Sequence, residues 1–297
     1  MRIAITGGTG LLGKCFVKYL NEIGDHTPIV LSRNKSRINL DSEVRITNYS
    51  ITSLKEVLSD VDAVVHLAAQ RGASENIQDF NENGYITQNL YEACVEIGIE
   101  NIVYASTIAV YSNDIPLPWD EENPTSPQTV YGISKMCSEH IGGFYARKYG
   151  LKVKNLRFPP IFGVIDQNDK MSKRMINHFM LQAIRKDTLV LHSHSNAQRE
   201  FLYVKDASRA IFCAVKAHEI GGVFNIGNSE LLTNKKVAKY INQAFYNEGN
   251  LYVEDSEEDT TESSYMVSLK ALNQLGFKAQ YSLYEAMKDI YKEMQNV

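Results

Sequence analysis

The stretch Arg2-Ile-Ala-Ile-Thr-Gly-Gly-Thr-Gly-Leu-Leu-Gly13 decides how this chain begins to fold. An apolar run leads into three spaced glycines, Gly7, Gly10 and Gly13, and apolar residues at helical spacing follow over 11–23. Such glycines allow a tight turn and let the backbone approach a pyrophosphate, which free N–H groups at a helix start can bind. The first gap is one residue longer than in the G-x-G-x-x-G fingerprint. The stretch predicts a strand, a dinucleotide-binding turn and a helix; the alternative is a glycine-rich turn without a ligand.

Short strands and longer helices continue to alternate through the first half of the chain. Apolar and β-branched runs predict strands at 27–32, 44–46, 63–68, 101–106, 152–158 and 223–226. Helical spacing of apolar residues predicts helices at 53–58, 80–98, 131–148, 175–186 and 283–294. This alternation is typical of βαβ units, so we expect an α/β fold with a doubly wound parallel sheet of the Rossmann type.

The length suggests two parts. A dinucleotide-binding domain is expected at 1–157 and a smaller, mainly substrate-binding lobe at 158–297, with 223–228 returning to the main sheet. Between the predicted strand at 101–106 and the predicted helix at 131–148, residues 112–130 form the longest segment without a periodic pattern, which indicates a functional loop.

Composition narrows the class of function. The chain has 297 residues, a net charge of −4 and 22% charged residues, and it contains no long basic run, so we expect no nucleic-acid partner. Four cysteines, at 15, 94, 137 and 213, are too few and too widely spaced for a disulfide framework or a zinc site, and we expect buried thiols. A strand that follows Met1 directly and the lack of a long apolar run predict no membrane span and a cytoplasmic location.

The end of the second predicted strand bears on the cofactor. An NAD-binding protein would place Asp or Glu there to accept a hydrogen bond from the ribose 2′-OH. This chain has Ser32 and Arg33 instead, followed by Lys35 and Arg37. Guanidinium groups match phosphate oxygens, so NADP is favoured over NAD as the cofactor. The alternative is that these are surface charges of a loop.

A second constellation follows downstream. Tyr131 and Lys135 stand four residues apart on one face of a predicted helix, where an ammonium would stabilise the phenolate. A phenol of this kind can take a proton from an alcohol or return it to a ketone. The strand at 101–106 ends at Ser106 and Thr107, and the hydroxyl of Thr107 is the better placed to donate to the reacting oxygen.

Together these motifs resemble the extended short-chain dehydrogenase/reductase family, and specifically its NAD-dependent epimerase/dehydratase group. The resemblance covers nearly the whole chain and rests on 6–13, 61–69, Asn83, Thr87, 105–111, Tyr131, Lys135, 157–163, 199–206 and 223–227. It implies that Tyr131 transfers the proton, that Lys135 holds the ribose, and that Arg199 contacts a substrate diphosphate, unless Arg199 forms an interdomain salt bridge. It also implies a homodimer formed through a helical bundle that includes 131–148.

The same resemblance completes the expected site. Thr107, Tyr131 and Lys135 are the expected catalytic residues, and Thr107 and Arg199 are expected to bind substrate. The expected cofactor-binding residues are Gly7, Thr9, Gly10, Leu11, Leu12, Gly13, Ser32, Arg33, Leu67, Ala68, Ala69, Asn83, Tyr131, Lys135, Phe158 and Pro159.

Three departures from the family pattern limit what can be expected of the substrate. Ile108 and Ala109 occupy the positions of the Asp-Glu pair of the family's dehydratases, which argues against that reaction. No arginine follows Arg209, and 254–262 is acidic, although Lys170, Lys173 and Arg174 offer alternative positive charges. His192 and His194 could line a pocket, but without a carboxylate nearby in sequence we expect no metal site.

The expected function is that of an NAD(P)-dependent epimerase or reductase, which interconverts a secondary alcohol and a ketone on a small-molecule substrate, a nucleotide sugar. One alternative is an NADPH-dependent reductase of a ketone or aldehyde without a nucleotide diphosphate. Another is a non-catalytic dinucleotide-sensing regulator, against which the Tyr131 and Lys135 pair argues.

Overall fold

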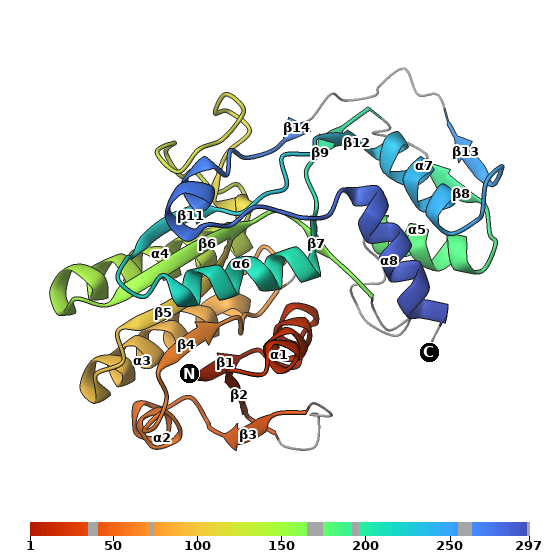
Figure 1. The fold of residues 1–297 in the computed structure, drawn as a ribbon. Helices are drawn as coiled ribbons and strands as arrows, with labels where there is room; N and C mark the ends of the chain where they lie inside the picture. The colour runs from red at the N-terminus through yellow and green to blue at the C-terminus, as the bar shows by residue number, and fades with distance from the viewer. Residues whose placement is uncertain (35–40, 72–73, 165–174, 192–195, 255–262, 296–297) are drawn as a thin grey trace.

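The computed structural model describes residues 1–34, 41–71, 74–164, 175–191, 196–254 and 263–295. A parallel sheet of seven strands in the order β11-β6-β5-β4-β1-β2-β3 forms its centre (Figure 1). The strands are β1 (Arg2–Thr6), β2 (Thr27–Ser32), β3 (Glu43–Ile46), β4 (Ala63–His66), β5 (Asn101–Thr107), β6 (Lys152–Phe158) and β11 (Gly222–Asn225). The predicted doubly wound sheet is confirmed.

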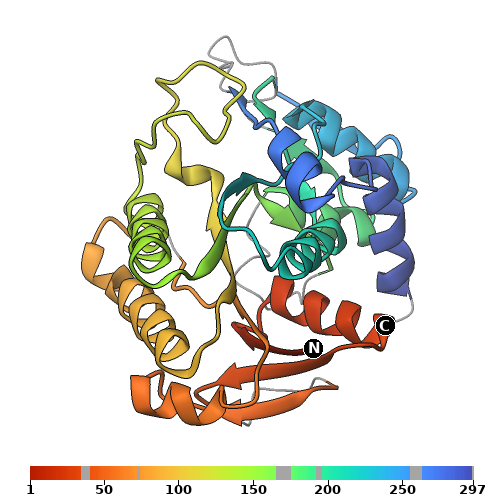
Figure 2. The same cartoon turned by 60° about the vertical axis from the view of Figure 1, so that its left-hand side comes forward.

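Helices cover both faces of this sheet (Figure 2). One face carries α1 (Leu11–Ile23) and α6 (Val204–Lys216), and the other carries α2 (Ile51–Val57), α3 (Asn81–Ile97) and α4 (Val130–Tyr149). Alternate strand residues point to opposite faces, so neighbouring positions enter different cores. Val103 packs in the core that includes Phe16 of α1, whereas Ile102 packs in the core that includes Leu90 of α3.

The rest of the chain forms a lobe beyond the carboxyl edge of the sheet (Figure 1). It contains α5 (Met175–Ile184), α7 (Asn234–Ala244) and α8 (Leu283–Gln295). Its short strands are β7 (Ile161–Phe162), β8 (Leu189–Leu191), β9 (Gln198–Arg199), β10 (Leu202–Tyr203), β12 (Leu232–Thr233), β13 (Leu251–Val253) and β14 (Ser263–Ser264). Because Ile3 of β1 and Ile290 of α8 belong to one hydrophobic core, the lobe packs continuously with the sheet.

β11 leaves the lobe and pairs in parallel with β6 at the edge of the main sheet. The division into a 1–157 domain and a 158–297 lobe stays a prediction. Two helices, α6 and α7, were not predicted from the sequence. In α6 the apolar residues Val204, Ala207, Ile211 and Val215 recur at helical spacing, so the signal was present.

The cysteine prediction needs a correction. Cys94 is buried and Cys15 and Cys213 are partly buried, but Cys137 is exposed because it lies on the outward face of α4. All four thiols are free. Among the helices within the described residues, none has the length and apolar character needed to cross a membrane.

Candidate active site

The carboxyl ends of the central strands bring the expected site residues to one edge of the sheet. Thr6 at the end of β1 lies beside Leu31 of β2 and His66 of β4, and Thr107 at the end of β5 lies beside Phe158 of β6. Ligands of open α/β sheets bind outside this edge. The structure therefore places the turn at Gly7 and the start of α4 at the same end of the molecule.

The glycine turn packs tightly against the backbone around it. A Cβ on Gly7 would lie 2.7 Å from the backbone nitrogen of Ala68, and one on Gly13 would lie 2.3 Å from the carbonyl oxygen of Gly7. Gly10 begins α1 without a side-chain cap, so no side chain competes for the first N–H groups of the helix. Side chains at Gly7 and Gly13 would therefore prevent the close packing of this turn against the loop after β4 and against the start of α1.

A pocket of about 260 Å³ lies beside this turn. It gathers seven of the expected cofactor residues from four separate segments: Gly7, Thr9, Ser32, Arg33, Ala68, Ala69 and Asn83. Tyr49, Gln70, Glu82 and Ile86 also line it and were missed in the sequence. Gln70, Glu82 and Ile86 adjoin the motif positions 61–69, Asn83 and Thr87, whereas Tyr49 lies in a segment without a motif. The other expected residues do not line this pocket. Among them, Leu11, Leu12 and Gly13 lie in the first turn of α1, Leu67 follows β4, and Phe158 and Pro159 are buried at the end of β6.

Arg33 is the positive charge of this pocket. Its side chain is 52% exposed and forms a 3.0 Å ion pair with Glu82 at the start of α3. The guanidinium also lies 5.5 Å from the ring centre of Tyr49. The other two candidates for a 2′-phosphate, Lys35 and Arg37, lie outside the described residues.

Lys135 is buried where α4 crosses β5. It is 2% exposed, its ammonium donates a 2.6 Å hydrogen bond to the carbonyl oxygen of Ala105, and it lies 4.5 Å from the ring centre of Tyr104. Burial lowers the pKa of Lys135 to about 7, and the positive charge of Arg71 acts in the same direction. Arg71 follows the pocket residue Gln70 and was missed in the sequence.

Tyr131 and Thr107 stand on two elements that pack closely, the start of α4 and the end of β5. A Cβ on Gly132 would lie 2.3 Å from the carbonyl oxygen of Ala109, so this glycine lets α4 pack directly on the short helix η3 (Ile108–Val110) after Thr107. The hydroxyl oxygen of Thr107 accepts from the backbone N–H of Ala109 at 3.2 Å. Within the described part of the chain, its own hydrogen has no acceptor and the phenol of Tyr131 has no hydrogen-bond partner. Both hydroxyls are therefore available to a substrate oxygen.

Asn83 connects the cofactor pocket to α4. Its side-chain oxygen accepts from the backbone N–H of Gln70 at 2.6 Å, and its amide donates to the carbonyl oxygen of Gln70 at 3.1 Å. The same amide lies 3.2 Å from the hydroxyl of Ser134, the neighbour of Lys135. Asn83 therefore holds the loop after β4 against the helix that carries the expected catalytic residues.

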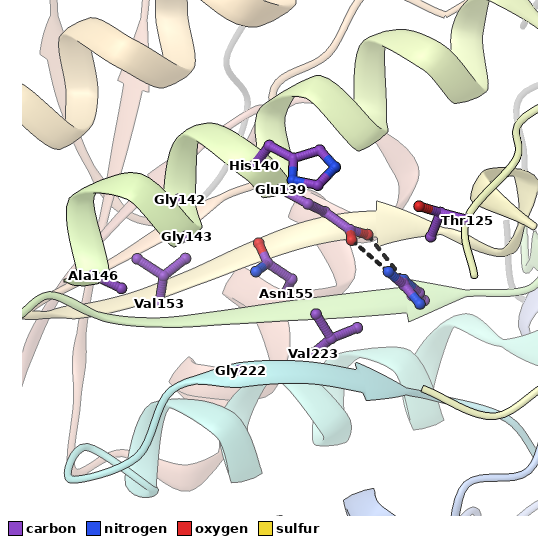
Figure 3. Close-up of a pocket in the computed structure, with 11 residues that line it drawn as sticks. Thr125, Glu139, His140, Gly142, Gly143, Ala146, Val153, Asn155, Gly222 and Val223 are labelled. Atoms are coloured by element: carbon purple, nitrogen blue, oxygen red, sulfur yellow. Dashed lines mark hydrogen bonds and ion pairs between the residues drawn. The ribbon is translucent and has the colours of Figure 1, made fainter. Parts of the chain in front are cut away.

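A buried ion pair joins α4 to β6. Arg157 donates twice to Glu139, over 3.1 and 2.7 Å, and once to the hydroxyl of Tyr111 at 2.7 Å, while Ser106 also bonds Glu139. Glu139 and Arg157 line a second pocket of about 260 Å³ between α4, β6 and β11. Figure 3 shows the side chains of this pocket, with Glu139 labelled on α4. No expected site residue lines that pocket. Glu139 was missed, although it lies one helical turn after Lys135.

The lobe presents Arg199 on β9, which pairs with β12 and β14. Arg199 does not line the cofactor pocket. The next residue, Glu200, is buried and accepts from the backbone N–H groups of Asn228, Ser229 and Met266. Burial raises the pKa of Glu200, although these three bonds oppose the rise.

The remaining candidates lie outside the described residues: Lys170, Lys173, Arg174, His192, His194 and the acidic residues of 255–262. In the part of the chain that the structure describes, no group of three or more His, Cys, Asp or Glu side chains could hold a metal ion.

Comparisons with known proteins agree with this architecture. The profile of the NAD-dependent epimerase/dehydratase family matches residues 3–227. The crystal structure of UDP-N-acetylglucosamine 4-epimerase from Bacillus cereus is similar over 100% of this chain and 97% of its own, with a TM-score of 0.91 and 45% identity.

Two further comparisons are more distant. The UDP-glucuronic acid 4-epimerase of Bacillus cereus, in complex with UDP-glucuronic acid and NAD, shares the fold, with a TM-score of 0.84 and 21% identity over 100% of this chain and 99% of its own. The UDP-glucose 4-epimerase of Corynebacterium glutamicum is 26% identical over 259 residues, which are 80% of this chain and 79% of the relative. This chain belongs to the NAD-dependent epimerase/dehydratase family of enzymes.

Proposed function

We propose that this chain is a UDP-sugar 4-epimerase and that UDP-N-acetylglucosamine is the first substrate to test. The observation that supports this proposal is the close packing of the start of α4 on the end of β5: Lys135 donates to the carbonyl oxygen of Ala105, and a Cβ on Gly132 would lie 2.3 Å from the carbonyl oxygen of Ala109. The substrate class is supported by the 45% identity, over the whole chain, to a UDP-N-acetylglucosamine 4-epimerase.

The chain's own residues would move the proton. The phenolate of Tyr131 takes the proton of the C4 hydroxyl as that carbon is oxidised, and Tyr131 returns it when the ketone is reduced on its other face. Lys135 places a positive charge near the phenolate, and Thr107 donates its hydrogen to the reacting oxygen. A bound nicotinamide dinucleotide supplies the hydride acceptor and donor.

The test is to incubate the protein with UDP-N-acetylglucosamine or UDP-glucose and follow the sugar by NMR. Formation of the 4-epimer without net oxidation or reduction of the dinucleotide is the expected result. If no UDP-sugar is epimerised while a ketone or aldehyde consumes NADPH, the reductase alternative replaces this proposal. Dinucleotide binding without turnover of any substrate would favour the sensor alternative.

For the cofactor, we propose that NADP binds more tightly than NAD. Arg33 lines the pocket at the end of β2, and Ser32, Arg33 and Asn34 supply no carboxylate there to accept from a 2′-OH. The carboxylate of Glu82, which pairs with Arg33, opposes a phosphate in the same pocket. Arg33→Ala should weaken NADP binding selectively, and Glu82→Gln should strengthen it; tighter binding of NAD to the unaltered protein would overturn the proposal.

We also propose a homodimer formed through α3 and α4, which pack side by side. Ile133, Cys137 and Phe144 recur on the outward face of α4, and Tyr85 is exposed on α3. Light scattering should show a dimer that Phe144→Glu converts to a monomer, and a monomeric unaltered protein would refute it. A cytoplasmic location stays a prediction.

A further inference from the structure

His66, the last residue of β4, is buried between the glycine turn and α3. It is 1% exposed, and both ring nitrogens have partners. Nδ1 lies 2.7 Å from the hydroxyl oxygen of Thr6, and Nε2 lies 3.1 Å from the hydroxyl oxygen of Thr87. The ring therefore spans the gap between β1 and α3.

The surrounding bonds decide where the ring carries its hydrogen. The hydroxyl oxygen of Thr6 accepts from the backbone N–H groups of Leu67 at 3.1 Å and Ala68 at 3.0 Å. Because both lone pairs are used, the hydrogen of Thr6 points to Nδ1 of His66, which must be unprotonated. A neutral ring then carries its hydrogen on Nε2 and donates to Thr87.

The chain continues in the same direction beyond the ring. Thr87 donates its own hydrogen to the carbonyl oxygen of Asn83 at 2.7 Å. Burial lowers the pKa of His66 to about 3, and the positive charge of Lys135 adds to this effect, so the ring stays neutral at physiological pH. The hydroxyl of Thr87 also lies 3.4 Å from that of Ser138, and the N–H of Leu67 also lies 3.2 Å from the carbonyl oxygen of Thr6. With the hydrogen of Thr6 directed at Nδ1, the series runs in one direction from Thr6 to the carbonyl oxygen of Asn83.

This series joins the two loops that line the cofactor pocket. Thr6 precedes Gly7, whose backbone is so close to Ala68 that a Cβ would lie 2.7 Å from the Ala68 nitrogen. At the far end of the series, Asn83 accepts a hydrogen bond from the backbone N–H of Gln70 and donates one to the hydroxyl of Ser134, which is next to Lys135. One ring therefore sets the separation of the glycine turn, the loop after β4 and the start of α3.

We propose that His66, as the neutral Nε2–H tautomer, is a positioning residue for the dinucleotide, holding Thr6 and Thr87 so that the pocket keeps its width. This inference rests on the proposed dinucleotide site. His66 does not line the pocket, so its effect on the cofactor passes through Thr6, Leu67, Ala68 and Asn83.

The test compares His66→Phe and His66→Gln with the unaltered protein by calorimetric titration of NADP and of NAD. Phenylalanine keeps the ring but removes both hydrogen bonds, and we expect dinucleotide affinity to fall about tenfold or more. Glutamine can accept from Thr6 and donate to Thr87, so it should restore most of the affinity. Leu90→Ala is the matched control, because Leu90 is equally buried on α3 but lies outside the series.

The control should lower thermal stability without changing the affinity of the folded protein. In protein labelled with ¹⁵N-histidine, the nitrogen shifts of His66 should show a bare Nδ1 and a protonated Nε2. Three results would overturn this inference without touching the proposed function. They are a protonated Nδ1, a dinucleotide affinity of His66→Phe within twofold of the unaltered protein, and a loss of affinity in Leu90→Ala equal to that in His66→Phe. If the unaltered protein binds neither dinucleotide, the proposed function falls as well.

Discussion

The ammonium of Lys135 and the carbonyl oxygen of Ala105 lie 2.6 Å apart, and the Lys135 side chain is buried. This bond joins α4 to β5 at Ala105, two residues before Thr107. It also holds a cation near the start of α4, which lowers the stability of the fold. A buried ammonium is expensive unless it is paired, and Lys135 has one carbonyl partner among the described residues. Such a cost is typical of a functional position.

Replacement of Tyr131 by phenylalanine should lower kcat by at least about a hundredfold, because general acid–base catalysis contributes about that much or more. Dinucleotide affinity should change by less than about threefold, since the phenol is only one of many contacts. Steady-state kinetics and titration measure the two effects. Tyr85→Phe, at an exposed tyrosine of α3, is the control and should behave like the unaltered protein.

Replacement of Lys135 by methionine should abolish turnover and raise stability at low pH. The pKa of Lys135 falls from 10.5 to about 7 on folding, so the unfolded chain holds a proton that the folded chain releases within that window. Stability of the unaltered protein therefore falls as pH decreases from 10.5 to 7, and the full cost remains below pH 7. Urea unfolding should show the variant to be more stable at about pH 6, with the difference shrinking toward pH 10. A constant difference would contradict this.

Gly132→Ala should impair catalysis through the position of α4. The added Cβ would lie 2.3 Å from the carbonyl oxygen of Ala109, so the start of α4 and the short helix after Thr107 must shift relative to each other. We expect a loss of about 1–3 kcal/mol in stability, together with a lower kcat. Gly84→Ala on α3 is the matched control: nothing lies within 4 Å of its Cβ, and it should gain about 0.5–1 kcal/mol. Equal kcat values in the two variants would exclude the steric argument.

Glu139→Gln should be strongly destabilising, because it leaves the charge of Arg157 buried without a counterion. Loss of one partner of a buried pair costs about 3–5 kcal/mol. The control is Glu96→Gln, which breaks the exposed pair with Lys55 and should cost less than about 1 kcal/mol. Chemical unfolding of both variants gives the comparison, and similar losses would show that burial of the Arg157 pair is unimportant.

His66 should make the fold sensitive to acid. Its pKa falls from 6.5 to about 3 on folding, so the unfolded chain takes up a proton between these values and stability is lost as pH falls through this window. In His66→Gln the unfolding free energy should therefore decline less steeply below about pH 6.5 than in the unaltered protein. Parallel stability curves for the two proteins would show that His66 does not take up this proton.

Much of the sheet could be predicted from the sequence because its signals are local. The strand at 2–6, the glycine turn and the helix at 11–23 are adjacent, and each follows from residue types and their periodicity. Tyr131 and Lys135 are recognisable for the same reason, since a separation of four places two side chains on one helical face.

The contacts that shape the site depend instead on residues distant in the chain. Arg33 pairs with Glu82, Glu139 with Arg157, and His66 bridges Thr6 and Thr87. No local pattern indicates these partners, because they meet only when α3 and α4 pack on their face of the sheet. Residue types and spacing thus identified the fold and the chemical groups of the candidate site. Packing across the sheet determined which residues these groups contact, how deeply they are buried, and the pKa of Lys135.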